Sequence, residues 1–308
     1  MMKLLTVVAS VRSEAQSEHF AQVFAHSGEL LHNKNKIQMT VDSQEGISRI
    51  ELSGRLPAFR LDQDSQQFQA ESAVALADYV MRHEERGLLG KLIRDDFHYS
   101  QEEEAEQILA YCEQMLGEGH DEGEEYRLAM SRRKEKLATE IEAYVSTETV
   151  LHLDGLLRFR LQSYKQELRD VVEYAVDEFV MDRQYQEFIS LLQYFVYIQE
   201  AKIPFVHLVH KGGNEFTLLN DRMEQIETDD PDAIVTVEML EKDMNFEDMI
   251  VSTLITVSPQ TIYIHTREPD AQVIKTIRQI FENRVELCGY CRLCHNLDRS
   301  AAAEYNKG

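Results

Sequence analysis

The feature that most constrains this chain is helical spacing of apolar residues, sustained from Ser65 to about Lys202. The clearest example is the segment "KQELRDVVEYAVDEFVMD", in which apolar side chains recur every three or four residues and acids lie opposite. Its apolar positions are Leu168, Val171, Val172, Ala175, Val176, Phe179 and Val180. The next segment, "YQEFISLLQYFVYIQE", is apolar around much of its circumference, which is typical of a helix buried between elements or at an interface. Loops are predicted at "RGLLGK", at "GEGHDEGEE" and around "LHLDG".

Both flanks of this helical region predict strands. "LLTVVAS" is a strand by its β-branched content, a helix is expected in "SEAQSEHFAQVFAHSGELL", and "IQMTVD" and "ISRIEL" form a hairpin that turns at Gly46 and ends before Pro57. After Pro204, "FVHLVH" and "FTLLN" form a second hairpin around Gly212 and Gly213. The order then continues with a helix in "NFEDMIVSTLITV" with Asn245 as N-cap, a strand in "TIYIHT" and a helix in "DAQVIKTIRQIFENRV". The apolar stripe of that last helix is Val273, Ile274, Ile277, Ile280 and Phe281.

These patterns predict an α+β protein with four segments. Residues 1–62 form a small N-terminal α/β unit, and residues 63–202 form a central, mostly helical region. Residues 203–296 form a C-terminal α+β unit with a terminal cysteine segment, and residues 297–308 form a flexible tail.

Charge and hydropathy limit the classes of function. A formal net charge of −23 repels phosphate, so the prediction is no nucleic-acid binding; the one basic candidate is "RLAMSRRKEK", next to an acidic run from Asp95 to Glu125. We expect these two runs to be solvated helix faces that attract each other. No stretch approaches the ~20 apolar residues of a membrane span, and no signal peptide begins the chain. We therefore expect a soluble cytoplasmic protein.

Three blocks together resemble a known family. They are "LRFRLQSYKQELRDVVEYAVDEFVMDRQYQEFISLLQYFVYIQE", "NFEDMIVSTLITVSPQTIYIH" and "IFENRVELCGYCRLC", which together span roughly Leu151 to Cys294. In this order and spacing they are similar to the YtxC-like family, a group linked to spore formation in endospore-forming bacteria. The resemblance implies a cytoplasmic protein of the sporulation programme. It carries over no biochemical activity and no catalytic residues.

The segment "CGYCRLCHN" is the clearest candidate site. Cys288, Cys291 and Cys294 stand at spacings of three, and cytoplasmic thiols stay reduced, so metal binding is favoured over disulfides. Two thiolates three residues apart can hold one tetrahedral zinc ion, and Cys294 supplies a third ligand. The fourth ligand is then Cys112, one of His207, His210 or His265, or a group from a second chain. The adjacent His295 is less suitable, because neighbouring residues rarely point at the same ion.

Four other interpretations of the segment stay open. CxxCxxC begins a bacterial iron–sulfur run, but the expected fourth cysteine and its proline are missing. "CRLCH" matches a c-type haem attachment pattern, which belongs to exported proteins, and "CGYC" matches a dithiol redox pair. Such a pair gains reactivity at a helix N-terminus, whereas Cys288 is expected after a helix C-terminus. In the last interpretation, the cysteines are small apolar residues that pack under the final helix.

No other constellation favours catalysis. The pairs Glu173 with Asp177 and Glu178 with Asp182 are expected on a solvated helix face, and the common nucleotide and hydrolase motifs are absent. Arg158 and Arg160 are expected to form ion pairs with acidic helices. The leading hypothesis is therefore a non-enzymatic protein that contacts a protein partner through the helical face around Tyr185 to Tyr197. The alternative is a metal-dependent or redox activity at the three cysteines.

Overall fold

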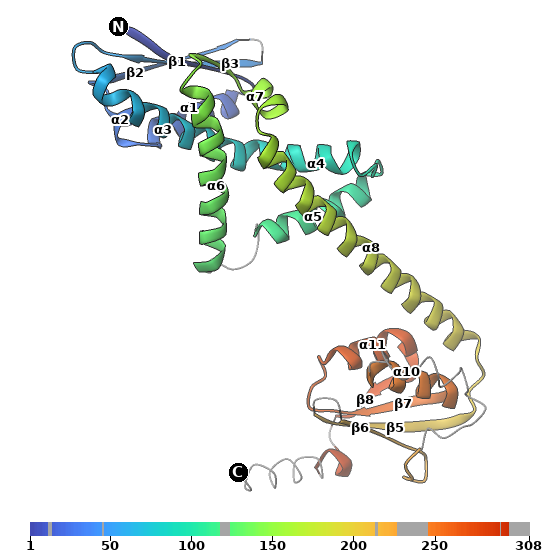
Figure 1. Cartoon of the computed structure of the whole chain (residues 1–308). Coiled ribbons are helices and arrows are strands. Elements are labelled where there is room, and N and C mark those ends of the chain that lie inside the picture. Colours follow the sequence, from blue (N-terminus) through green and yellow to red (C-terminus); the bar gives the residue numbers. More distant parts are fainter. Residues whose placement is uncertain are drawn as a thin grey trace. The chain divides into compact units, whose positions relative to one another are not determined.

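The computed structural model describes residues 1–11, 14–44, 46–117, 124–212, 215–226, 246–289 and 291–295. It divides the chain into two compact units, Met1–Met181 and Asp182–Gly308. Each unit contains a four-stranded mixed sheet with helices, which confirms the predicted α+β class (Figure 1). Asn245, the predicted helix cap, and the predicted tail at 297–308 lie outside the described residues.

The first unit begins with the strand, helix and hairpin order that the sequence predicts. Its strands lie in the order β2-β3-β1-β4; β3 is antiparallel to both β1 and β2, whereas β1 and β4 are parallel. Gly46 adopts a positive φ of 80° in the hairpin turn, as tight turns require. The elements of this part are β1 (Met2–Ser10), α1 (Glu14–His26), α2 (Glu29–His32), β2 (Ile37–Gln44), β3 (Ile47–Gly54) and β4 (Val150–His152).

Helices make up the rest of the first unit and share one apolar core with its sheet. They are α3 (Leu61–Tyr79), η1 (Val80–Glu84), α4 (Glu85–Asp95), α5 (Glu102–Leu116), α6 (Glu124–Val145) and α7 (Leu153–Phe159). Two predicted loops are wrong. "RGLLGK" lies inside α4, where Leu89 and Ile93 are buried, and "LHLDG" forms the end of β4 and the start of α7. Burial of their leucines outweighs the local preference of glycine for loops.

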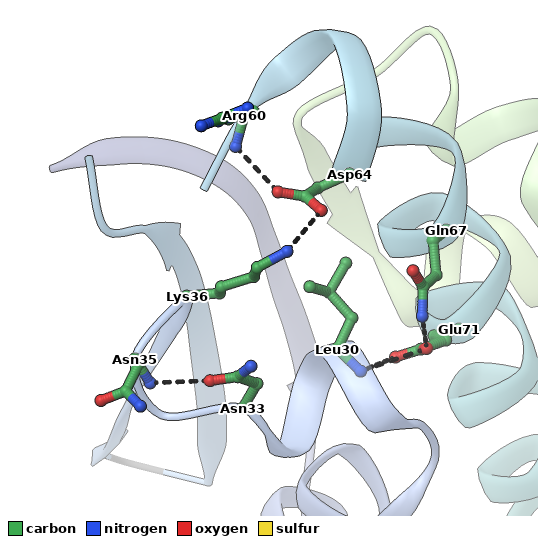
Figure 2. A network of polar contacts seen from close by, with 8 residues as sticks. All are labelled: Leu30, Asn33, Asn35, Lys36, Arg60, Asp64, Gln67 and Glu71. Carbon is green, nitrogen blue, oxygen red and sulfur yellow. Dashed lines mark hydrogen bonds and ion pairs between the residues drawn. The ribbon is translucent and has the colours of Figure 1, made fainter. Parts of the chain in front are cut away.

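Polar contacts connect the start of α3 to the hairpin region (Figure 2). The carboxylate of Asp64 accepts hydrogen bonds from the backbone N–H of Arg60 and from Lys36 Nζ, both at 2.8 Å. These contacts lower the pKa of Asp64, the backbone bond most strongly. Glu71 accepts hydrogen bonds from the backbone N–H groups of Leu30 and Leu31 at 3.0 and 2.9 Å. Glu71 thereby satisfies donors at the N-terminus of α2 that the helix itself cannot pair.

A buried ion pair connects α4, α6 and the start of α8 (Gln162–Ile198). Arg133 pairs with Glu85, and the hydroxyl of Tyr164 donates a hydrogen bond to the same carboxylate. Only 3% of the Glu85 side chain and 11% of the Arg133 side chain are exposed. Burial and the nearby Glu85 raise the pKa of Tyr164, so its hydroxyl stays protonated as a donor.

Further basic residues of "RLAMSRRKEK" also take part in ion pairs within the first unit. Lys134 pairs with Asp78, and Lys136 pairs with Glu167. Neither partner belongs to the acidic run at 95–125. These two lysines therefore do not form the expected contacts between the basic and the acidic run. Arg86 pairs instead with two acids of that run, Glu106 and Glu113.

A single helix, α8 (Gln162–Ile198), replaces the two helices expected from the sequence. Its predicted stripe in the first unit is confirmed, with Leu168, Val172, Ala175 and Phe179 buried and the acids of the carboxylate pairs exposed. Its last turns contribute Ile189 and Val196 to the core of the second unit. In the part of the chain that the structure describes, neither α8 nor any other helix combines the length and apolar character needed to cross a bilayer.

The second unit is built on crossovers between parallel strands. Its sheet has the order β6-β5-β7-β8; β5 and β6 form the predicted antiparallel hairpin, and β5, β7 and β8 are parallel. Helices α10 and α11 lie on one face of this sheet (Figure 1). The bounds are β5 (Ile203–Gly212), β6 (Glu215–Leu219), α10 (Phe246–Val257), β7 (Pro259–His265), α11 (Gln272–Phe281), η2 (Glu282–Arg284) and β8 (Val285–Leu287). All five apolar residues of the predicted α11 stripe are buried, as expected.

Replacing Arg133 tests the buried ion pair. Arg133→Met leaves the Glu85 carboxylate buried without its counter-charge, so we expect the free energy of unfolding to fall by about 3–5 kcal/mol. The matched control is Arg86→Met, which removes exposed ion pairs and should cost less than ~1 kcal/mol. Urea denaturation of the full chain, followed by circular dichroism, measures both. Equal, small losses in the two variants would show that the buried pair contributes little.

Candidate metal centre

The three predicted cysteines lie together at the end of β8. The backbone N–H of Cys288 donates a 2.9 Å hydrogen bond to the carbonyl of Ile264 in β7, which places Cys288 beside His265, the last residue of that strand. A helical turn follows, in which the N–H of His295 donates to the carbonyl of Cys291 at 3.0 Å. Because residues three apart lie on one side of such a turn, Cys291 and Cys294 face the same point.

His265 completes a group of four potential ligands. One ligand atom from each of His265, Cys288, Cys291 and Cys294 lies within 4.8 Å of all the others. The Sγ atom of Cys294 is 3.8 Å from that of Cys288 and 4.0 Å from that of Cys291. Nδ1 of His265 is 3.4 Å from Sγ of Cys291 and 3.5 Å from Sγ of Cys294.

These separations match the edges of a tetrahedral metal site. With Zn–S bonds of about 2.3 Å and a Zn–N bond of about 2.0–2.1 Å, tetrahedral geometry places sulfurs about 3.8 Å apart and sulfur about 3.5 Å from nitrogen. The structure therefore brings three thiols and one imidazole nitrogen into an arrangement that can hold one metal ion.

The surroundings of His265 favour the neutral imidazole, which can bind a metal. His265 is buried, and burial together with the neighbouring His207 lowers its pKa. A lowered pKa keeps the imidazole neutral near pH 7, which is the form that binds a metal. Side chains alternate along β7: Ile262 and Ile264 belong to the apolar core of the second unit, so His265 points to the opposite face of the sheet.

The thiols differ in their proton affinity. Burial, reinforced by the neighbouring thiols, raises the pKa of Cys288 to about 11. Burial acts in the same direction on Cys291, but hydrogen bonds from the backbone N–H groups of Cys294 and Leu293, together with those to the Cys288 and Cys294 thiols, outweigh it and lower the pKa of Cys291. Thiols must release their protons before the three sulfurs can bind a metal as thiolates.

The other proposed fourth ligands lie elsewhere. His207 lies outside the ligand group and contacts it through His265, with its Nδ1 3.0 Å from Nε2 of His265. His210 is buried, its Nδ1 lies 2.7 Å from Thr266 Oγ1, and its ring stacks on Phe216. Cys112 is buried in the core of the first unit, where burial raises its pKa to about 12. The sequence indicates His265 only as one of several candidate ligands, because the strand order that selects it is not visible in local patterns.

Arg158 and Arg160, for which the sequence predicts ion pairs with acidic helices, lie over aromatic rings. The guanidinium of Arg160 lies 5.8 Å from the centre of the Tyr144 ring, and that of Arg158 lies 6.0 Å from the Phe159 ring. Both are cation–π distances, and they favour a structural role within the first unit.

Comparison with known proteins places the chain in a family. The model of the YtxC-like family matches residues 71–286, more than two thirds of the chain. The chain belongs to the YtxC-like family. It is 26% identical over 272 residues to a protein of Bacillus subtilis (strain 168) described as "Uncharacterized protein YtxC", and the match covers 88% of this chain and 92% of that protein. The family match ends two residues before Cys288, and no solved structure matches the chain.

Metal binding at this site should depend on pH in a defined direction. Protons compete with the metal for the thiols, so the affinity for added Zn²⁺ should rise with pH between about 6 and 8. Cys288→Ser removes one of the competing protons and should make this dependence less steep. Competition titration against a chelator of known affinity, corrected for its own protonation, measures the effect. An affinity for Zn²⁺ that does not change with pH would contradict ligation by thiolates.

Proposed function

We propose that the second unit binds one zinc ion and that the ion stabilises its fold. The observation that carries this proposal is the convergence of His265 Nδ1 with the Sγ atoms of Cys288, Cys291 and Cys294. Three thiolates and one imidazole are a recurrent ligand set of structural zinc sites. Four protein ligands fill a tetrahedral site, whereas catalytic zinc sites keep one position for water or substrate. The proposed role of the ion is therefore structural and not catalytic.

The competing interpretations of the cysteine segment find less support. An iron–sulfur cluster normally takes four thiolates, and Cys112 lies in the core of the other unit. The sulfur separations of 3.8 and 4.0 Å suit ligands of one ion and exceed the ~2.05 Å of a disulfide bond. Packing alone explains the burial of Cys294, but Cys288 and Cys291 are only partly buried.

Elemental analysis of anaerobically purified protein tests the zinc proposal. We expect about one zinc per chain, an absorption spectrum without iron–sulfur bands, and a lower unfolding temperature after chelation, because metal-binding energy is folding energy. Cys294→Ala should lose the zinc, and the control Cys112→Ala should keep it. Iron with sulfide, or the absence of any stoichiometric metal, would overturn the proposal. A chelated protein that keeps its full stability would rule out the structural role.

A second function rests on an apolar surface of α8. We define the α8 stripe as Phe188, Leu191, Phe195 and Ile198, which are exposed by 54%, 67%, 48% and 57%. Their spacing of three, four and three residues is that of a coiled-coil seam. The opposite side of the helix, with Ile189 and Val196, is buried in the second unit. The stripe is thus an additional apolar face.

We propose that the α8 stripe binds an amphipathic helix of a protein partner that carries basic residues beside its apolar face. The support is the seam spacing together with charge: Glu187 is exposed on α8 at the edge of the stripe, Glu200 is exposed just beyond the end of the helix, and the chain as a whole carries −23. This negative charge favours a lysine-rich or arginine-rich helix as the partner.

Designed peptides test this contact. A helical peptide with leucines in the seam and lysines beside it should bind the protein, and the same peptide with glutamates in place of the lysines should bind at least tenfold more weakly. Leu191→Lys places a charge in the seam and should abolish binding. Ser190→Lys is the matched control, because it adds the same charge on an exposed position outside the α8 stripe. Fluorescence anisotropy of the labelled peptides measures their binding to the unaltered protein and to both variants. Equal binding by the two variants would contradict the proposed surface.

We further propose that the protein acts in the cytoplasm during spore formation. Membership in the YtxC-like family supports this setting, and the reducing cytoplasm suits a site made of three thiols. A deletion strain that forms heat-resistant spores at the normal frequency and rate would contradict it.

A further inference from the structure

His207 is the residue that contacts the far side of the proposed zinc ligand. It lies in β5, which runs parallel to β7, and its Nδ1 is 3.0 Å from Nε2 of His265. The rings of Phe205 and Tyr263, each centred 5.5 Å from the His207 ring, flank it. His207 therefore has a defined orientation on the same sheet face as His265.

This geometry determines which ring nitrogen carries the proton in each of the two imidazoles. A metal held by Nδ1 of His265 uses the lone pair of that nitrogen, so the single proton of the neutral ring must sit on Nε2. Nε2–H then donates to Nδ1 of His207, and the proton of His207 sits on its own Nε2.

We propose that His207 is the positioning residue of the metal centre. It accepts the hydrogen bond from His265 Nε2, selects the tautomer in which Nδ1 is the free ligand atom, and holds that atom toward the three sulfurs. The inference rests on the proposed zinc site and adds to it a residue that lies outside the ligand set. Outer partners of this kind typically change metal affinity by 10–100-fold when they are removed.

His210 shows why burial on the strand does not by itself define such a role. It is more buried than His207, yet its alternation on β5 places it on the other face, next to Thr266 Oγ1 and the Phe216 ring. Of the two histidines on β5, only His207 has its ring nitrogen within hydrogen-bond distance of His265.

Three variants separate positioning from packing. His207→Phe keeps a ring but removes the acceptor, and we expect it to weaken zinc binding about 10–100-fold and to change the absorption bands of the Co²⁺-substituted protein. His207→Asn restores an acceptor at a similar reach and should recover most of the affinity. Tyr263→Phe leaves the acceptor intact beside the same ring and should bind zinc normally. Chelator competition and the Co²⁺ spectrum are the two measurements.

A measurement on the unaltered protein provides a second test. Nitrogen-15 NMR of the zinc-loaded full chain reports which ring nitrogen carries each proton, and we expect Nε2–H for both His265 and His207. Normal zinc affinity in His207→Phe, no recovery in His207→Asn, or a proton on Nδ1 of His207 would each overturn the inference while the zinc site stands. An unaltered protein without stoichiometric zinc would instead overturn the proposed function itself.

Discussion

The parallel pairing of β7 with β8 is the contact on which the candidate site depends. It aligns Ile262 with Val285 and Ile264 with Leu287, so the chain leaves β8 directly beside the end of β7. The hydrogen bond from the N–H of Cys288 to the carbonyl of Ile264 continues this alignment by one residue. His265 and the cysteine segment, more than twenty residues apart in sequence, meet for this reason.

The pairing of β7 with β8 is short, so β8 gains little stability from it. A bound ion would therefore add stability to this part of the unit. β8 has only three residues, and its side chains are partly or fully exposed, so it buries little apolar surface of its own. The chain segments on either side of β8 therefore hold the strand in place. Before it, the buried stripe of α11 and Arg284, whose guanidinium donates to the carbonyls of Val196 and Gln199, attach it to the core. After it, an ion held by His265 and three cysteines would connect the edge of the sheet to the last turn of the described chain.

The sequence predicted what short-range patterns determine. The β2–β3 and β5–β6 hairpins and the α11 stripe follow from alternation, turn glycines and helical spacing, and the structure confirms them. Burial overrode a local signal in α4, where Leu89 and Ile93 are buried although Gly87 and Gly90 made the segment resemble a loop. In α8 the helix continues through the exposed residues Asp182 and Arg183, because no proline or glycine there breaks it. The cysteine spacing identified three members of the candidate site. The fourth required the strand order β6-β5-β7-β8, which places β7 rather than the β5–β6 hairpin beside the cysteines.

The proposed function depends on one zinc ion held by a nitrogen of His265 and the sulfurs of Cys288, Cys291 and Cys294. X-ray absorption spectroscopy at the zinc edge of the purified full chain tests it most directly, because it counts the nitrogen and sulfur neighbours of the ion. We expect three sulfurs at about 2.3 Å and one nitrogen at about 2.0–2.1 Å from the zinc ion. A shell of oxygen and nitrogen with fewer than three sulfurs, or a shell of four sulfurs, would contradict it.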